Sequence, residues 1–418
     1  MVPIGYESML KSELEPYKVD YLFLLMGDNP LPNYIAAISL LKSKGTAFLV
    51  HTARTKLQAQ RLEKVLVQTK PFHSAYLIDL GDRQADAYGI GGKIREYTEG
   101  LSGLVGLNYT GGTKAMSVHT YRAIEKIYPE AVFSYLDSNS LEMYFDSDIQ
   151  DSDRIKVSPQ LSLSKMFQLH GLSWRVPPSN TPVIPKLAIK FAQLHQDPIL
   201  AESWRKWCNQ ELRRKARTRD QKQWKEESEL RKISPLNLQS LPETVQELLQ
   251  DVGAKNCQLS LVTACEYGFS DYTSICEWFD GIWLEHFVLA QVQTVAKDLN
   301  IQESKMSFRI DEKSSQWRQW EKFEFDVAFV RNSQLFALSC TTTSDRRFCK
   351  QKLFEANTRA RQLGGIEARV GLVCCNDNPD SLRSELEVET RDRKIAVFGR
   401  QDLGDLGQKI QRWVQQND

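Results

Sequence analysis

The chain reads NYTGGTKAMSVH over residues 108–119, directly after an apolar run at residues 101–107. An apolar run, a pair of glycines and then helical spacing predict a strand, a tight turn and the start of a helix. The adjacent Gly111 and Gly112 let the backbone take positive φ and let a ligand approach the amides closely. We therefore expect this turn to be a binding site, and the fold of the preceding residues is interpreted around it.

Polar side chains at the same turn indicate an anionic ligand. The hydroxyls of Thr110 and Thr113 and the ammonium of Lys114 would converge where the N-terminus of the helix favours negative charge. These groups predict a phosphate site. The pattern is not a Walker A loop, because the four-residue spacer and the Gly-Lys-Ser/Thr ending are missing, and it is not the dinucleotide fingerprint. A simple helix entry with Thr113 as its N-cap is the alternative explanation.

The first 150 residues alternate between apolar segments and stretches with helical spacing. The predicted strands are residues 20–25, 46–51, 75–80 and 101–107. This alternation predicts a parallel, doubly wound sheet, whose ligands bind at the carboxyl ends of the strands. The loops at such ends are residues 27–33, 52–55 and 110–114. Residues 132–136 and 141–145 flank a short turn and predict a hairpin that closes the domain.

Two loop motifs resemble those of a known family. Residues 27–33 read GDNPLPN and residues 108–116 read NYTGGTKAM. Together they resemble the CRISPR-associated Rossmann fold (CARF) domains of type III CRISPR effectors. The resemblance implies that residues 1–150 bind a cyclic oligoadenylate, usually cyclic tetra-adenylate, in the cleft of a homodimer. The ligand-binding residues that it implies are Asn29, Asn33, Thr52, Arg54, Thr110, Gly111, Gly112, Thr113 and Lys114.

Residues 151–265 are predicted to form a linker and a small, mostly helical module. A charged pattern with helical spacing runs over residues 202–232 and contains the most basic cluster of the chain. The cluster consists of Arg213, Arg214, Lys215, Arg217 and Arg219. It is interpreted either as a solvated helix face or as a strip that binds the phosphates of RNA or DNA.

The last predicted domain covers residues 266–418. Glu285 is a lone carboxylate among large apolar residues on a predicted helix, and such an acid must face a site or a cleft. Asp326 lies in an alternating segment that predicts a strand, followed by a turn and a partner strand. The order of acids, strands and helices resembles a restriction-endonuclease-like PD-(D/E)XK core. In CARF-linked nucleases of this kind, the two acids hold a divalent metal, manganese or magnesium, together with a Glu-x-Lys on the next strand.

Glu285 and Asp326 match that family pattern, but the third element does not. Where the family has Glu-x-Lys, this chain has Ser339, Cys340 and Thr341. The hydroxyls of Ser339 and Thr341 could still hold metal-bound water, and Lys350 on the next helix could supply the missing cation. A metal-poor site could instead cut RNA by using the 2′-hydroxyl of the RNA as the nucleophile. A degenerate, catalytically silent domain is the other alternative.

Composition limits the remaining classes. The chain has 418 residues, 41% of them hydrophobic, a formal net charge of +1 and eight cysteines without a paired CxxC arrangement. A near-neutral chain has no overall field for nucleic acid, so any such contact must come from a local patch. The scattered cysteines favour reduced thiols over a zinc ribbon or a disulfide framework. The sequence shows no signal sequence and no apolar run that could span a membrane, so we expect a cytoplasmic protein.

Fold and function are therefore predicted together. The fold class is α/β: an N-terminal doubly wound Rossmann-like CARF domain and a C-terminal restriction-endonuclease-like α/β domain, joined by a mostly helical segment. The predicted function is that of a homodimeric nuclease that a cyclic oligoadenylate activates. Its expected substrate is single-stranded RNA, with single-stranded DNA as the second choice. The alternative is a ring nuclease, or a ligand-binding scaffold whose C-terminal domain is catalytically degenerate.

Overall fold

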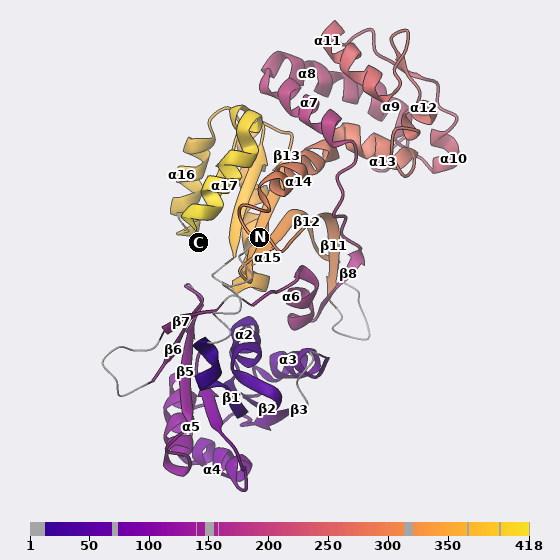
Figure 1. Ribbon diagram of the computed structural model, residues 1–418. Coiled ribbons are helices and arrows are strands. Elements are labelled where there is room, and N and C mark those ends of the chain that lie inside the picture. Colours follow the sequence, from indigo (N-terminus) through magenta and orange to yellow (C-terminus); the bar gives the residue numbers. More distant parts are fainter. Residues whose placement is uncertain are drawn as a thin grey trace.

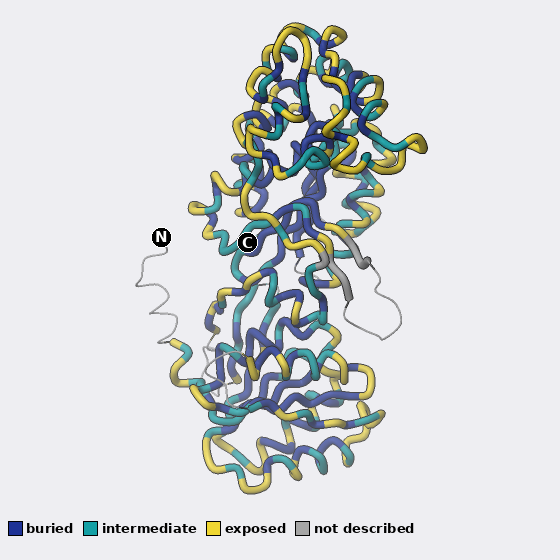
Figure 2. The backbone as a smooth tube through the Cα atoms, turned by 90° about the vertical axis from the view of Figure 1, so that its right-hand side faces the viewer, coloured by how far each residue is buried: buried dark blue, intermediate teal, exposed yellow. Residues whose placement is uncertain are grey.

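Two β-sheets and a helical module follow one another along an elongated molecule (Figure 1). The computed structural model describes residues 13–68, 74–138, 140–146, 154–157, 159–312, 321–365, 368–392 and 394–417. The N-terminal sheet lies at one end, the C-terminal sheet lies in the middle, and the helical module packs at the other end (Figure 1). The most deeply buried segments follow the strands of both sheets (Figure 2).

The N-terminal sheet has seven strands in the order β3-β2-β1-β4-β5-β6-β7. Its strands are β1 (Val19–Leu25), β2 (Leu41–His51), β3 (Ser74–Asp79), β4 (Val105–Asn108), β5 (Val132–Asp137), β6 (Glu142–Phe145) and β7 (Arg154–Lys156). The first five strands are parallel, and β6 and β7 pair antiparallel. The predicted doubly wound sheet and its closing hairpin are thus confirmed.

Helices cover both faces of this sheet because its strands are apolar on both sides. The helical elements are η1 (Glu15–Tyr17), α2 (Leu31–Leu40), α3 (Lys56–Gln68), α4 (Ala87–Thr98) and α5 (Lys114–Ile127). One apolar cluster joins Leu22 and Leu24 of β1 to α2 and α3. A second cluster joins Phe23 and Leu25, the alternate residues of the same strand, to α4 and α5. Alternation along β1 therefore supplies both cores.

The C-terminal sheet has six strands in the order β15-β14-β13-β12-β11-β8. The strands are β8 (Leu172–Val176), β11 (Glu303–Glu312), β12 (Glu321–Arg331), β13 (Gln334–Thr341), β14 (Arg369–Cys374) and β15 (Ala396–Phe398). Antiparallel pairing connects β8, β11, β12 and β13, whereas β13, β14 and β15 are parallel. The edge strand β8 comes from a part of the chain that precedes the helical module.

Two sets of helices enclose this second sheet. The helical elements are α6 (Leu163–Leu169), α14 (Trp283–Val295), α15 (Arg346–Gly364), α16 (Pro379–Thr390), η6 (Arg400–Asp405) and α17 (Leu406–Gln416). Apolar residues of α14 and α17 share a cluster with Phe336 and Leu338 of β13. Residues of α6, α15 and α16 share a different cluster with Leu335 and Ala337 of the same strand. The sheet is thus covered on both faces.

The helical module consists of short elements around an aromatic core. It contains α7 (Pro185–Gln196), α8 (Pro198–Trp207), η2 (Cys208–Arg213), α9 (Arg214–Ala216), α10 (Glu227–Leu230), β9 (Leu236–Asn237), α11 (Glu243–Leu248), η3 (Leu249–Val252), β10 (Gln258–Leu259), α12 (Leu261–Cys265), α13 (Tyr272–Glu277) and η4 (Trp278–Ile282). Trp204, Trp207 and Trp278 of this core belong to the same apolar cluster as α14 and α17. The module therefore packs as an extension of the C-terminal domain.

One apolar cluster also joins the two sheets to each other. Leu31 and Ile35 of α2 share it with Phe167 of α6 and with Leu353 of α15. In addition, the Ser333 hydroxyl, in the turn between β12 and β13, donates to the Pro159 carbonyl oxygen at 2.5 Å. The two α/β domains are therefore in direct contact through apolar packing.

The cysteines and the helices agree with the compositional expectations. All eight cysteines are free, and six of them are buried within the apolar clusters on the two faces of the C-terminal sheet. A search of the helices in the described residues found none that combines the length and the apolar character needed to cross a bilayer.

Candidate functional site

Glu285 lies in the first turn of α14, directly after a break in the helix. Gly281 has φ of 149°, which only glycine adopts readily, so the chain bends between η4 and α14. The bend separates the aromatic core of the module from the helix that carries the acid. Glu285 is 7% exposed, and its Oε2 accepts a hydrogen bond of 2.5 Å from the Ser307 hydroxyl.

Asp326 lies on β12 and is 9% exposed. Val327 pairs with Leu338, so Asp326 is placed opposite Ser339 of the neighbouring strand. Its Oδ2 accepts hydrogen bonds from the Ser339 hydroxyl at 3.0 Å and from the Cys340 amide at 2.6 Å. A side chain thus replaces the ladder contact at the end of the strand pair and fixes the carboxylate.

Ser307 links the two acids. Met306 pairs with Val327 and Phe308 pairs with Phe325, so Ser307 lies opposite Asp326 on the other side of β12. Ser307 has φ of 50°, a left-handed conformation that costs a non-glycine residue on the order of 1 kcal/mol or more. Its hydroxyl is thereby directed to Glu285. The sequence gives no signal for this residue, because β11 was not predicted.

Burial makes both carboxyl groups hard to ionise. Burial raises the pKa of Glu285 well above its usual range, and repulsion from Asp326 adds to this effect, against the hydrogen bond from Ser307. Burial also raises the pKa of Asp326, while the charge of Lys352 and the Cys340 amide partly oppose the increase. Two acids that repel each other in a poorly solvated place are expected to bind a cation.

Asp326 and Ser339 open onto a cavity of about 340 Å³. Its remaining polar lining comes from β12 and from one side of α15. These residues are Glu324, Lys352, Glu355 and Arg359. The Arg359 guanidinium forms an ion pair with Glu355 and donates to the Glu324 carbonyl oxygen at 3.4 Å. The cavity thus combines a buried acid with two cations on its wall.

The glycine turn of the N-terminal domain lies where strand order reverses, between β1 and β4. A Cβ on Gly111 would lie 2.2 Å from the Leu25 carbonyl oxygen and 2.9 Å from the Gly27 nitrogen, so the loops after the two strands touch. Gly112 has φ of 77°. This position, at the carboxyl ends of two adjacent strands that lead in opposite directions, is where ligands bind in doubly wound sheets.

The threonines of this turn hold the structure together. The Thr113 hydroxyl is the N-cap of α5 and accepts from the Met116 amide at 3.2 Å. It also donates to the Gln84 carbonyl oxygen at 2.9 Å. Thr110 accepts from the Leu136 amide at 2.7 Å. The helix-entry role considered from the sequence is therefore present, and it leaves the N-terminus of α5 exposed together with Gly112 and Lys114.

Two of the residues expected to bind ligand are buried, and their polar groups form hydrogen bonds within the protein. Asn33 is 1% exposed, and its Nδ2 donates to the Leu25 carbonyl oxygen at 2.9 Å. Thr52 is buried, and its amide donates to the Thr55 hydroxyl at 3.1 Å. Arg54 is exposed and forms an ion pair of 2.5 Å with Asp28 of the β1 loop. Only Arg54 of these three presents its side chain at the surface of the site.

Asn29 faces the other domain. Its Oδ1 accepts from the Leu31 amide at 3.0 Å and so caps α2. Its Nδ2 lies against Gly365 at the end of α15, where a Cβ would be only 2.6 Å away. Ser333 and Gln334 line the same small space between the domains. The structure therefore places Asn29 at a contact between the glycine-turn domain and the helix that borders the acidic cavity.

The comparisons with known proteins agree with this geometry. Residues 274–417 match the family described as Card1-like, endonuclease domain. The Card1-like region contains Glu285, Asp326 and Ser339. No curated protein matches the sequence.

Solved structures share the fold over nearly the whole chain. Protein VC1899 from Vibrio cholerae has a TM-score of 0.71 at 16% identity, covering 95% of this chain and 98% of its own. Can2 from Sulfobacillus thermosulfidooxidans, in complex with cyclic tetra-adenylate, has a TM-score of 0.64 at 18% identity, with 94% and 99% coverage. A type III CRISPR defence DNA nuclease activated by cyclic oligoadenylate gives 0.50 at 14% identity, covering 88% of this chain and 49% of its own. These structures share the two-domain fold expected from the sequence, and the family match supports the expected endonuclease domain at the C-terminus.

Within the Card1-like region, the structure does not bring Lys350 to the acids. Its ammonium forms ion pairs with Glu385 and, at 3.4 Å, with Glu389, both on α16. Thr341 does not line the cavity, and its hydroxyl accepts from the Thr343 amide at 3.4 Å. Lys352 borders the cavity instead. Two residues along a helix correspond to about 200° of rotation, so Lys350 and Lys352 face different neighbours.

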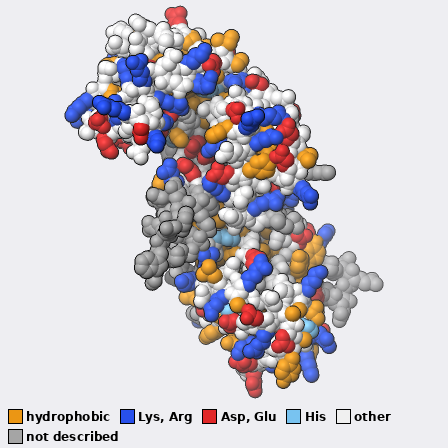
Figure 3. Space-filling view, turned by 180° about the vertical axis from the view of Figure 1, so that it is seen from behind, with side chains coloured by type: hydrophobic (Ala, Val, Ile, Leu, Met, Phe, Trp, Pro, Cys, Tyr) orange, Lys and Arg blue, Asp and Glu red, His pale blue; other side chains and the backbone are white. Residues whose placement is uncertain are grey.

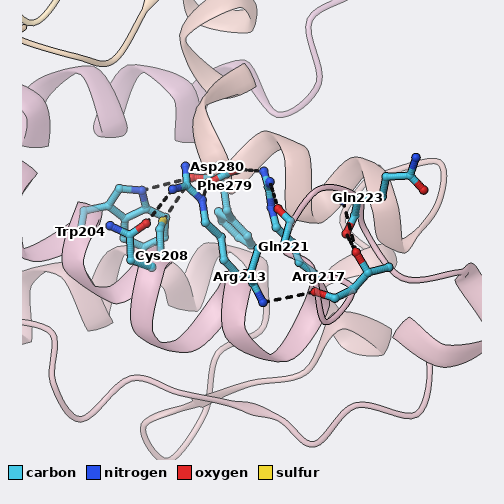
Figure 4. A network of polar contacts seen from close by, with 10 residues as sticks. Trp204, Cys208, Arg213, Arg217, Gln221, Gln223, Phe279 and Asp280 are labelled. Atoms are coloured by element: carbon cyan, nitrogen blue, oxygen red, sulfur yellow. Dashed lines mark hydrogen bonds and ion pairs between the residues drawn. The ribbon is translucent and has the colours of Figure 1, made fainter.

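The basic cluster of the helical module is partly structural (Figure 4). The Asp280 carboxylate accepts from Arg213 Nε at 2.6 Å and from Arg217 Nη2 at 2.8 Å. Arg217 also lies over the Trp224 ring, 4.4 Å from its centroid. The predicted helical pattern over residues 202–232 is interrupted after Ala216, because Arg217 is extended and bridges to Trp224, and helix returns only in α10 (Glu227–Leu230). Figure 3 shows that acidic side chains are interspersed with the cations of this module.

Proposed function

We propose that this protein is an endonuclease of type III CRISPR defence that is switched on by a cyclic oligoadenylate. The observation that carries the proposal is the convergence of Glu285 and Asp326, of which Asp326 borders an open cavity. Both acids are buried, both are held by hydrogen bonds from serine hydroxyls, and the pKa of each is raised by burial. A purely structural domain has no reason to retain two buried acids that repel each other.

A divalent cation fits this donor set. Magnesium binds through one or two carboxylates and keeps several waters, and the described residues contain no group of three or more His, Cys, Asp or Glu that could hold an ion on their own. Glu285 and Asp326 would hold magnesium or manganese. When bound, the ion stabilises charge at the scissile phosphate and lowers the pKa of a bound water.

The protein groups around the acids have their own tasks in the proposed reaction. Ser307 orients Glu285, whereas Ser339 and the Cys340 amide orient Asp326. Because Asp326 already accepts two hydrogen bonds on Oδ2, we assign its other oxygen to the ligand. The cavity of about 340 Å³ provides the space in which a nucleotide phosphate can approach Asp326.

We propose single-stranded nucleic acid as the substrate. The loss of Glu-x-Lys favours RNA, since RNA can use its own 2′-hydroxyl. The two retained acids support a hydrolysis that needs no 2′-hydroxyl, so single-stranded DNA belongs to the proposal as well.

The activator is proposed to bind at the glycine turn of a homodimer in the cytoplasm. A ring of phosphodiesters needs amides, hydroxyls and cations, and the exposed N-terminus of α5, Lys114 and Arg54 offer these groups. A symmetric ring also fits a two-fold interface. Cyclic tetra-adenylate is the first ligand to test, because Can2, a structural neighbour, was solved in complex with it.

A cleavage assay tests the proposal. Wild type, Glu285→Gln and Asp326→Asn are incubated with single-stranded RNA or DNA, with and without cyclic tetra-adenylate, manganese and a chelator. We expect cutting only by the wild type with ring and metal together. Identical behaviour of all three proteins would overturn the proposal. If the ring is consumed and no strand is cut, the ring-nuclease alternative takes its place.

A further inference from the structure

Lys352 lies on the wall of the acidic cavity, together with Asp326 and Ser339. It is half-buried on α15, the helix that covers the sheet face to which Ala337 and Ser339 belong. Lys352, Glu355 and Arg359 recur with helical spacing, so they form one polar row beside the buried residues of the same helix. This row, rather than the strand, supplies the positive charge of the cavity.

The charge of Lys352 acts on the acids themselves. It opposes the increase in the pKa of both Glu285 and Asp326, and also in the pKa of the buried Cys340 thiol. Lys350 is instead held in ion pairs with Glu385 and Glu389 of α16. The geometry therefore favours Lys352 over Lys350, the lysine expected from the sequence to supply the cation.

We infer that Lys352 is the cation that contacts the scissile phosphate, in place of the lysine that β13 lacks at Thr341. The inference rests on the proposed nuclease function and assigns one of its catalytic residues. A strand lysine two residues after Ser339 would project from the same face of the sheet as Ser339. Lys352 reaches that face from the helix above it, so the ammonium arrives at the same cavity from a different element.

The chemical task is limited to charge. In hydrolysis, a water oxygen attacks phosphorus and gives up one proton to solvent, while the bond from phosphorus to one bridging ribose or deoxyribose oxygen breaks and that oxygen takes up one proton from solvent. Lys352 takes no part in this proton balance. Its ammonium donates to a non-bridging phosphate oxygen, where negative charge grows as the bond breaks, and such a donor is most effective when it is fixed in a poorly solvated site.

The matched pair Lys352→Ala and Lys350→Ala tests the inference. Both variants remove one lysine from the same helix, but only Lys352 borders the cavity. We expect Lys352→Ala to lower kcat by roughly 100-fold or more, by analogy with the removal of one transition-state donor. The kcat of Lys350→Ala is expected to stay within about threefold of the wild-type value, since ion pairs near the surface contribute little to stability. Both variants should bind cyclic tetra-adenylate and melt as the wild type does.

Chemical rescue of Lys352→Ala by an added amine distinguishes a catalytic role of Lys352 from a structural one. Methylamine, added to Lys352→Ala, should restore part of the rate, and Lys352→Arg should retain more activity than Lys352→Ala. Methylamine should not stimulate the wild type. Equal rates for Lys352→Ala and Lys350→Ala would overturn the inference, although the wild type would still be a nuclease.

A binding experiment keeps the inference testable if the wild type cuts nothing. The affinity for a short single-stranded oligonucleotide is measured in chelator at several salt concentrations. Loss of one phosphate contact should reduce the slope of log K against log salt by about 0.7 for Lys352→Ala, and leave it unchanged for Lys350→Ala. Equal slopes for the two variants would contradict the contact. Failure of the wild type to cut would concern the proposed function alone.

Discussion

Replacing Gly111 by alanine tests the contact between the loops after β1 and β4, where the ring is proposed to bind. The new Cβ would lie 2.2 Å from the Leu25 carbonyl oxygen and 2.9 Å from the Gly27 nitrogen, both closer than the 3.0 Å below which Cβ contacts essentially never occur. Both neighbours are backbone atoms at the end of a buried central strand, so they cannot swing aside. The loop after β1 must therefore separate from the turn after β4.

Overpacking of this kind costs roughly 1–3 kcal/mol. We expect Gly111→Ala to lower the free energy of unfolding by about that amount and to weaken the binding of cyclic tetra-adenylate as well. Chemical denaturation measures the first effect, and titration calorimetry measures the second. A suitable control is Gly92→Ala in α4, where the new Cβ would find only the end of the Arg95 side chain at 3.9 Å.

Gly92→Ala should leave ring binding unchanged and stabilise the protein by about 0.5–1 kcal/mol, because alanine is the better helix former. The reasoning would be refuted if Gly111→Ala unfolded at the same denaturant concentration as the wild type and bound the ring with the same Kd. In that case the loops after β1 and β4 would not meet as described.

Two further predictions concern charge. Lys114→Ala should weaken ring binding by about 1.5–3 kcal/mol, since a phosphate contact from an exposed ammonium without an ion pair to the described residues would be lost; an unchanged Kd would place the ligand elsewhere. The raised pKa of Glu285 means that the folded state binds this proton more tightly than the unfolded state does. Metal-free wild type should therefore lose stability as the pH rises above about 4.5, because burial and the charges of Asp326 and Glu324 disfavour the ionised form of Glu285 more than Ser307 and Lys352 favour it. Glu285→Gln should lose less stability over the same pH range in thermal unfolding scans with chelator, and equal losses for the two proteins would contradict the raised pKa.

The N-terminal fold could be predicted because its strands are clearly marked in the sequence as short apolar segments. Four apolar segments, each followed by a loop and a helical pattern, leave few alternatives to a doubly wound sheet. The roles of single polar residues in the loops were harder to predict. The local sequence around Asn33 is the same whether its amide faces a ligand or the Leu25 carbonyl oxygen, and only the folded structure shows that it donates to Leu25.

The two acids of the acidic site could be predicted from the sequence, whereas the lysine beside them could not. Glu285 and Asp326 stand out as carboxylates within apolar segments, and the structure brings them together through Ser307. Lys350 and Lys352 cannot be distinguished without the phase of α15 around the sheet. Once that phase is known, Lys352, Glu355 and Arg359 lie together on the wall of the cavity.

Strand β11 was missed for a physical reason. Its residues include several charged side chains, and its alternation is interrupted where Ser307 adopts a left-handed conformation. Met306 and Phe308 consequently belong to different apolar clusters although they are two residues apart. Period-two patterns assume a regular pleat, so a strand that turns over at a functional residue escapes them.

The edge strand β8 limits which fragments of this chain can fold on their own. It pairs with β11, yet it lies before the helical module and outside residues 274–417. A fragment cut at residue 274 would expose the backbone edge of β11 and the apolar surface that α7 and α8 cover, and would be prone to aggregate. During synthesis, β8 leaves the ribosome long before its partner strand exists. Residues 274–417 are therefore not expected to fold on their own. A fragment that keeps the C-terminal sheet intact must begin before Leu172.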